Sequence, residues 1–255
     1  MDRTTAKSGQ TEGRIRRFGP YRIVEHWMHA VVFIILVITG LSQKFHTYDL
    51  SQWMVLRLGG IDAVRLMHRI AGFILILLFV QHVLIAAWGV IRMRWQASMV
   101  IQLKDYQDAV TNLKYYFGLR SHPASCDRYD YKQKFDYWGV LVSNLIMICT
   151  GLILWFPITT TKFLYGEFIP AANVIHTNQS LLVILIIAIW HVYNSIFSPE
   201  IFPFDTSILT GYLTKERMVR EHPVELARME APAGKKINER PPLREKKMSP
   251  DRPLV

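Results

Sequence analysis

Residues 68–91 read HRIAGFILILLFVQHVLIAAWGVI, and this stretch decides the fold. From position 70 to position 91 it runs for 22 residues without an Asp, Glu, Lys or Arg. About 20 apolar residues cross the hydrocarbon core of a bilayer as an α-helix. The stretch is therefore predicted to span a membrane, with His68 at its start and His82 inside it.

Three other stretches lack charged residues in the same way. They cover residues 26–43, 137–161 and 168–199, and the last is long enough for its flanks to lie outside the hydrocarbon core. Four such runs in 255 residues favour an all-α membrane protein with a bundle of four transmembrane helices over a soluble helical protein. The first 20 residues are polar and basic, and the first apolar run is too long for a signal peptide, so we expect an uncleaved anchor.

The basic residues predict the orientation of the spans. Residues 1–25, 92–134 and 198–255 together hold 25 Lys and Arg, whereas residues 43–69 and 158–175 hold five. By the positive-inside rule, both termini and the loop between spans two and three are cytoplasmic. The net charge of +10 is then a topology signal with some attraction to membrane lipid, and we expect no nucleic acid partner.

The segments between and after the spans have their own patterns. Short helices are expected at residues 52–58, 63–67 and about 100–117, with a turn at Gly59-Gly60. Residues 231–255 are rich in proline and charge, which predicts a disordered basic tail. Spans one and three both carry Thr-Gly near their outer ends, a weak similarity without a full internal repeat.

The cysteines exclude several redox cofactors. Cys126 and Cys149 are the two cysteines of the chain, so it has no disulfide framework, no C-x-x-C-H for covalent haem and no cysteine cluster for iron–sulfur. Phosphate-loop, dinucleotide-binding and nucleophile-elbow motifs are absent as well. Any redox cofactor must be held by other side chains.

Histidines are the best candidates, because five of the nine lie in or at the edge of the predicted spans: His26, His68, His82, His176 and His191. His29 is a sixth if the interface is included, whereas His46, His122 and His222 are expected at the surface. An ionisable residue inside a membrane indicates function.

The spacing of the histidines predicts two layers. His82 follows His68 by fourteen residues and His191 follows His176 by fifteen, about 21 Å along a helix and roughly on one side of it. His68 and His176 then form an outer layer, and His26, His82 and His191 an inner one. Two haems stacked across a bundle would be held in this way.

Glycines and rival metals bear on the same prediction. Gly40, Gly72 and Gly151 allow close approach of a flat porphyrin, although ordinary helix packing explains them equally well. Zinc is the main chemical rival, because His26 and His29 at i, i+3 could share a metal. No H-E-x-x-H motif and no cluster of carboxylates or cysteines accompanies the membrane histidines.

Several short motifs resemble those of one family over residues 20–197. They are His26-Trp27 and Thr39-Gly40 in span one; His68-Arg69-Ile70-Ala71-Gly72 in span two; YDYKQK at 129–134 with Tyr137-Trp138 before span three; Thr150-Gly151, Trp155 and Pro157; and Ile175-His176 with Trp190-His191-Val192-Tyr193 in span four. In this order and spacing, the chain resembles the cytochrome b (gamma) subunits of respiratory formate dehydrogenases and the related subunits of nickel–iron hydrogenases and thiosulfate reductases.

The resemblance implies a four-helix domain over residues 21–197 with two haem b groups. His68 and His176 would ligate the outer haem, and His26 and His191 the cytoplasmic-side haem. Menaquinone or ubiquinone would bind near the latter, through residues 130–133, with Asp130 and Gln133 as candidate contacts. Residues 1–20 would be a cytoplasmic tail. Residues 198–255 would be a partly disordered cytoplasmic extension. Its segment 198–229 more weakly resembles the tail of b-type cytochromes that partner multihaem c-type cytochromes.

The chain departs from the family pattern at three points. Asp130 and Lys132 stand where relatives carry asparagine and glycine, which affects the expected quinone contacts. The span-four histidines are usually 14 residues apart, so the spacing of fifteen predicts a local bulge or a shifted ring. His82 is additional, and it could replace His26, ligate a third haem or bind a quinone; His26 is the preferred ligand.

The expected function is that of an anchor and electron conduit in the inner membrane of a bacterium or archaeon. Electrons would pass between a periplasmic iron–sulfur subunit or multihaem c-type cytochrome and the quinone pool at the cytoplasmic side. The chain would be a subunit of a quinone-linked oxidoreductase rather than an enzyme alone. A haem-free, histidine-lined transporter or metal-ion channel is the alternative, and a transmembrane ferric or ascorbate-type reductase is a third.

Overall fold

The structure is a computed structural model that describes residues 13–199 and 201–231. The segment 232–255, predicted to be disordered, and residues 1–12 of the predicted N-terminal tail lie outside the described residues. Internal contacts divide the chain into two compact units. One unit comprises Arg14–Val100 and Lys132–Leu213. The described part of the other unit comprises Gly13, Ile101–Tyr131 and residues 214–231.

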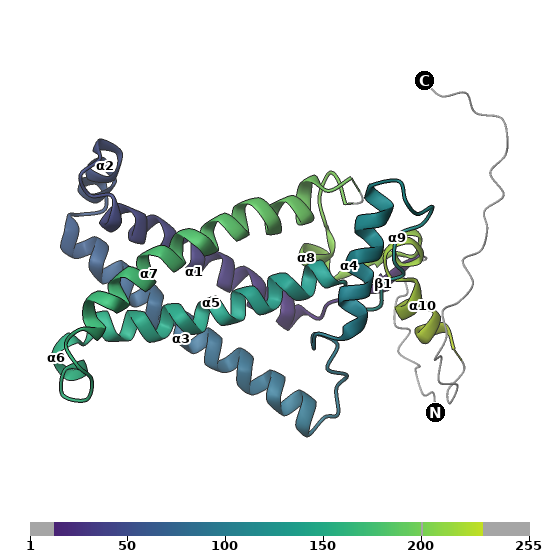
Figure 1. The fold of residues 1–255 in the computed structure, drawn as a ribbon, viewed down its shortest axis with the longest axis horizontal. Helices are drawn as coiled ribbons and strands as arrows, with labels where there is room; N and C mark the ends of the chain where they lie inside the picture. Colours follow the sequence, from purple (N-terminus) through teal and green to yellow (C-terminus); the bar gives the residue numbers. More distant parts are fainter. Residues whose placement is uncertain (1–12, 200, 232–255) are drawn as a thin grey trace, which may run out of the picture. The chain divides into compact units, whose positions relative to one another are not determined.

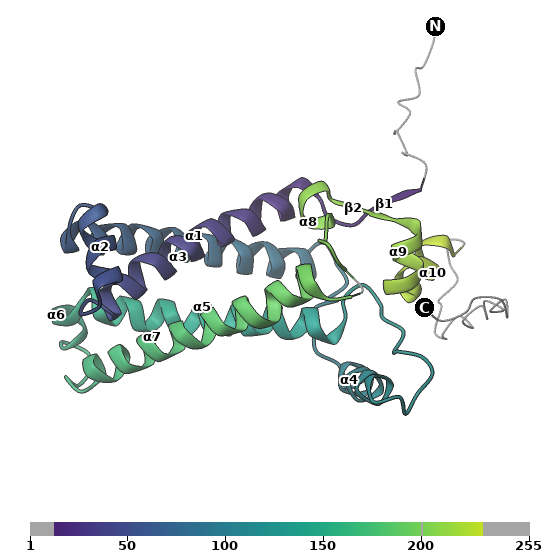
Figure 2. The same ribbon diagram turned by 90° about the horizontal axis from the view of Figure 1, so that it is seen from above.

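The larger unit is built on four long helices. They are α1 (Pro20–Lys44), α3 (Ile61–Ile91), α5 (Tyr131–Trp155) and a helical stretch over Phe168–Phe197 that begins with α7 (Phe168–Leu185). Each is long and apolar enough to cross a membrane by length and composition. The four run along one another, with α2 (Asp49–Arg57) and α6 (Pro157–Thr160) at one end and α8 (Ser207–Thr210) at the other (Figure 1, Figure 2). The predicted four-helix bundle is confirmed.

The bundle buries small and polar groups and presents large apolar ones outward. Val32 of α1 packs against Ala71 and Leu75 of α3, and these three form the buried apolar cluster. Thr39 and Thr150 are almost fully buried, whereas many leucines and isoleucines of the spans are more than half exposed. This pattern suits a bilayer, where close packing and polar contacts rather than hydrophobic burial bring helices together. The polar side chains therefore point into the bundle interior.

The fourth span changes its helical type before it ends. After α7 the chain forms two π-helical stretches, η1 (Ile186–His191) and η2 (Tyr193–Phe197). A π-helical turn accommodates an additional residue within a helix. The local bulge expected from the fifteen-residue spacing of His176 and His191 is confirmed, and it lies immediately before and at His191.

Other elements of this unit differ from the sequence expectations. Residues 63–67 belong to α3, which begins at Ile61, so the separate short helix predicted there is wrong. The turn before it is confirmed, and Gly59 and Gly60 have φ of 95° and 94°, a region that favours glycine. A two-stranded sheet of β1 (Arg14–Arg16) and β2 (Tyr212–Thr214) was not predicted, because three-residue strands show no recognisable periodicity.

The smaller unit contains α4 (Leu103–Tyr116), α9 (Lys215–Glu221) and α10 (Pro223–Glu230). An ion pair of 3.0 Å joins Arg128 to Glu225, and Arg228 pairs with Asp127. His222 is buried, and its Nδ1 donates to the carbonyl of Asp127 at 2.7 Å. The expectation that His222 is a surface residue is wrong, because α9 and α10 fold back on the 126–128 segment.

Candidate functional site

His68 of α3 and His176 of α7 face each other inside the bundle. Their ring centroids are 6.3 Å apart and their planes are inclined at 74°. The two residues come from helices that are far apart in the sequence, and each lies near the start of its span. The outer layer predicted from the spacing therefore consists of one opposed pair of imidazoles.

Threonine hydroxyls fix the orientation of both rings. The Oγ1 of Thr39 donates to the carbonyl four residues earlier at 2.7 Å and lies 2.8 Å from Nδ1 of His68. Thr150 repeats this arrangement, with 2.7 Å to the carbonyl and 2.9 Å to Nδ1 of His176. Since each hydroxyl proton is used by a carbonyl, each hydroxyl oxygen accepts from Nδ1–H. The Nε2 lone pair of each ring then remains available to a metal.

Glycines next to these threonines let the rings lie close to the neighbouring helices. A Cβ on Gly40 would come within 3.3 Å of Cε1 of His68, and a Cβ on Gly151 within 3.3 Å of Cε1 of His176. Gly72, one turn after His68 on the same face, has no atom within 4 Å of such a Cβ, apart from its own helix backbone. The two glycines that face the rings therefore let each ring approach the neighbouring helix.

His26 of α1 and His191 of η1 form a second opposed pair. Their centroids are 6.1 Å apart, with planes inclined at 34°. Asp136 of α5 holds His191 through an Oδ2–Nδ1 contact of 3.3 Å. Nδ1 of His26 and Oδ1 of Asp136 are buried and have no hydrogen-bond partner within the described part of the chain. The inner pair is therefore the one whose polar atoms have fewer hydrogen-bond partners.

His82 lies in a separate hydrogen-bonded chain that joins three helices. Its Nδ1 is 2.9 Å from Oε1 of Glu25 on α1, and its Nε2 is 3.1 Å from the hydroxyl of Tyr137 on α5. Glu25 is buried and also receives Arg22 at 2.8 Å. Both nitrogens of His82 are therefore already engaged by protein groups.

Glu25 and the two threonines are site residues that the sequence patterns did not predict. Glu25 is the last charged residue before the first charge-free run, so it served only as a boundary. The Thr-Gly dipeptides of spans one and three were the sequence signal that could have indicated the role of Thr39 and Thr150. Their recurrence reflects the same contact, a hydroxyl and a glycine against one histidine, made twice.

The candidate quinone contacts lie at the start of α5. Asp130 directly precedes the helix, and Gln133 lies in its first turn. Gln133 is exposed and lies one turn before Tyr137, on the same face of the helix. The helix that carries this candidate contact also carries Asp136 and Tyr137, which touch His191 and His82.

The two opposed pairs fit haem better than they fit zinc. Two imidazoles bound on opposite sides of one metal at about 2 Å each have ring centroids about 6 Å apart. The separations of 6.3 and 6.1 Å meet this requirement. Among the described residues, no group of three or more His, Cys, Asp or Glu could hold a metal ion. Iron in a porphyrin takes four ligands from the macrocycle and needs only two side chains from the protein, a number that each histidine pair could provide.

The sequence is similar to those of known b-type cytochromes. The sequence model of the family described as prokaryotic cytochrome b561 matches residues 17–202. The cytochrome b556(fdo) subunit of formate dehydrogenase from Escherichia coli (strain K12) is 22% identical over 209 residues, which are 82% of this chain and 90% of that protein. The nitrate-inducible cytochrome b556(Fdn) subunit of the same strain is 24% identical over 170 residues, 65% of this chain and 73% of that protein.

These matches confirm the resemblance noted from the short motifs. The family model covers all four candidate membrane spans and both histidine pairs. The family fits a helical bundle whose interior presents paired imidazoles, and its description implies haem b. The chain therefore belongs to the prokaryotic cytochrome b561 family and is a membrane electron-transfer cytochrome.

Proposed function

We propose that the chain is the membrane anchor and electron-transfer subunit of a respiratory oxidoreductase. It links a periplasmic redox partner to the quinone pool at the cytoplasmic side through two haem b groups. The observation that carries the proposal is the presence of two opposed imidazole pairs in one bundle, at 6.3 and 6.1 Å. The pairs lie about 20 Å apart along the helices, by the rise of an α-helix.

In this proposal His68 and His176 would hold the outer haem, and His26 and His191 would hold the cytoplasmic-side haem. Bound haem supplies a one-electron iron couple whose potential depends on its axial ligands and their hydrogen bonds. Thr39 hydrogen-bonds Nδ1 of its histidine and holds the ring in the ligating tautomer. Asp136 orients the ring of His191.

His82 is a bridging residue rather than a ligand in this proposal. Its two nitrogens bind Glu25 and Tyr137 at 2.9 and 3.1 Å, so ligation would break a chain that ties α1, α3 and α5 together. Leaving a buried carboxylate with one partner fewer would be costly. The number of haems is accordingly two rather than three.

Menaquinone or ubiquinone binds at the cytoplasmic end of the bundle, near Asp130 and Gln133. Support comes from the family pattern at residues 130–133 and from the position of these residues at the start of α5. The same helix orients His191, so a quinone held there would be close to the inner pair. The positive-inside bias supports the cytoplasmic placement of this end and of both termini.

The partner is a periplasmic iron–sulfur subunit or a multihaem c-type cytochrome of the same complex. The relatives are named as cytochrome subunits of formate dehydrogenase, which supports a catalytic complex rather than an enzyme acting alone. Helix α2, at the opposite end of the bundle from α8, offers an apolar docking surface. Its Leu50, Trp53 and Leu56 are 70%, 56% and 77% exposed. The chain would be a multi-pass protein of the inner membrane of a prokaryote.

Haem content per chain tests the proposal. The purified protein should contain two haem b groups by pyridine extraction, and His68→Ala and His26→Ala should each retain one, because each removes one axial ligand. His82→Gln should retain two, since it removes no ligand. Only the monodisperse fraction from size exclusion should be counted, which separates haem loss from misfolding. A haem-free folded protein, or loss of one haem in His82→Gln, would contradict the assignment.

The threonine contact has a separate signature. Thr39→Val keeps the shape but removes the acceptor of Nδ1–H of His68, so we expect haem retention to fall about tenfold or more at one site. The midpoint potential of that haem should rise, because a less basic imidazole stabilises ferric iron less. Pyridine extraction measures the haem that is retained, and a redox titration measures the midpoint potential. Thr39→Ser, the matched control, should behave like the wild type, and an unchanged potential in Thr39→Val would refute the role of the hydroxyl.

Quinone reactivity tests the cytoplasmic site. A water-soluble quinol should reduce the haem of the oxidised protein in stopped-flow absorbance measurements. Gln133→Ala should slow this reaction about tenfold, the effect of losing one hydrogen bond of about 1.4 kcal/mol. Gln52→Ala, an exposed glutamine on α2 at the other end, is the control and should react at the wild-type rate. Equal rates for both variants would place the quinone elsewhere.

A further inference from the structure

Helix α4 carries an exposed apolar stripe. Its members recur at intervals of three and four residues, which places them on one face of the helix. They are Leu103, Tyr106, Val110, Leu113 and Phe117, the last being the residue that caps the helix. Four of the five are exposed by 55% to 75%. A stripe of this width usually faces a core, and here it faces away from its own unit.

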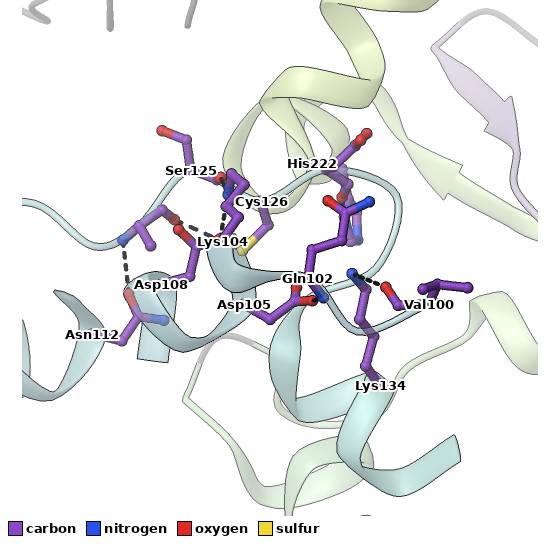
Figure 3. A network of polar contacts seen from close by, with 12 residues as sticks. Val100, Gln102, Lys104, Asp105, Asp108, Asn112, Ser125, Cys126, Lys134 and His222 are labelled. Carbon is purple, nitrogen blue, oxygen red and sulfur yellow. Dashed lines mark hydrogen bonds and ion pairs between the residues drawn. The ribbon is translucent and has the colours of Figure 1, made fainter. Parts of the chain in front are cut away.

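The polar face of the same helix is the covered one. Asn112 is 6% exposed, and its Oδ1 accepts the backbone N–H of Ala124 at 2.7 Å. Lys104 donates to the carbonyl of Ser125 at 3.0 Å and pairs with Asp108. Figure 3 shows these side chains directed at the 124–126 segment. The helix therefore exposes its apolar face and covers its polar face, the reverse of what is expected for a helix of a water-soluble unit.

Both connections of α4 lead directly to membrane-spanning helices, α3 before it and α5 after it. Eleven residues separate the end of α3 at Ile91 from Leu103, and fourteen separate Tyr116 from the start of α5 at Tyr131. Eleven residues span at most about 40 Å when fully extended. Both neighbouring helices are membrane spans, so α4 remains within reach of the bilayer surface whatever path the connections take.

Basic residues flank α4 along the chain and suit an anionic surface. Arg92 and Arg94 lie in the connection before it, Lys114 in its last turns and Arg120 just after it, and all four are exposed. Basic residues next to a cytoplasmic membrane surface are attracted to anionic lipid headgroups. An amphipathic helix with an apolar face and basic flanks lies in the plane of the interface, with its apolar side chains among the acyl chains.

We propose that α4 is an interfacial helix whose apolar stripe inserts into the headgroup layer of the cytoplasmic leaflet, with anionic lipid as its occupant. The 124–126 segment and the rest of the smaller unit would cover the side of α4 that faces water. The stripe thereby has a partner, and a large exposed apolar patch is avoided. The cytoplasmic assignment of this loop rests on the proposed orientation, whereas insertion of the stripe does not depend on haem or quinone binding.

Site-directed spin labelling of the full chain in nanodiscs tests this inference. In a background with Cys126→Ser and Cys149→Ala, single labels are placed by Leu113→Cys and Tyr115→Cys, two residues apart and on opposite faces of α4. In nanodiscs of phosphatidylglycerol, the label at 113 should collide more with oxygen and less with an aqueous nickel chelate than the label at 115. Haem absorbance of each labelled protein reports that the bundle is intact.

Lipid composition and the accessibility of the label at 113 to oxygen and chelate separate the possible occupants. In nanodiscs of phosphatidylcholine alone, the label at 113 should become more accessible to the chelate, and Arg120→Gln should weaken the difference between the two lipids. Equal chelate accessibility of both labels would overturn the proposal. It would also be overturned by a label at 113 that is shielded from oxygen and chelate alike, independently of lipid, because a protein partner or a second copy would then cover the stripe.

Discussion

The structure depends on the need to present neutral imidazoles to each other inside a low-dielectric bundle. A charged histidine is costly in the membrane, and a neutral one must still satisfy its Nδ1–H. At the outer pair, Thr39 and Thr150 meet this need, because a hydroxyl that already donates to its own helix can only accept from the ring. The result is two rings whose Nδ1–H groups are satisfied, held by two helices that present glycine and threonine at matching positions.

The inner pair has a different chemical environment around its rings. His191 is held by a carboxylate, Asp136, and a nearby chain of Arg22, Glu25, His82 and Tyr137 crosses three helices. The outer pair is therefore contacted by hydroxyl groups, whereas the inner pair lies among ionisable groups. This asymmetry agrees with the proposed function, since electron exchange with a protein partner needs no proton, whereas quinone chemistry does.

Much of the fold could be predicted from the sequence, because spanning a bilayer imposes long charge-free runs that local composition reveals. The pairing of His68 with His176 followed from helix rise and alternating direction, and even the irregularity before His191 was expected from one additional residue. The roles of Glu25, Thr39 and Thr150 could not be predicted, because they depend on which helix faces which. The burial of His222 and the β1–β2 pairing depend on contacts between distant segments, which periodicity does not record.

The central claim is that each of two haems is held by two imidazoles from this single chain. Near-infrared magnetic circular dichroism of the oxidised, purified protein tests it most directly, because the energy of the porphyrin-to-iron band identifies the axial ligand pair. The account predicts that all of the haem shows the bis-histidine band, with an intensity that corresponds to two low-spin haems per chain. A band from another ligand pair, or a high-spin fraction approaching half of the haem, would contradict it.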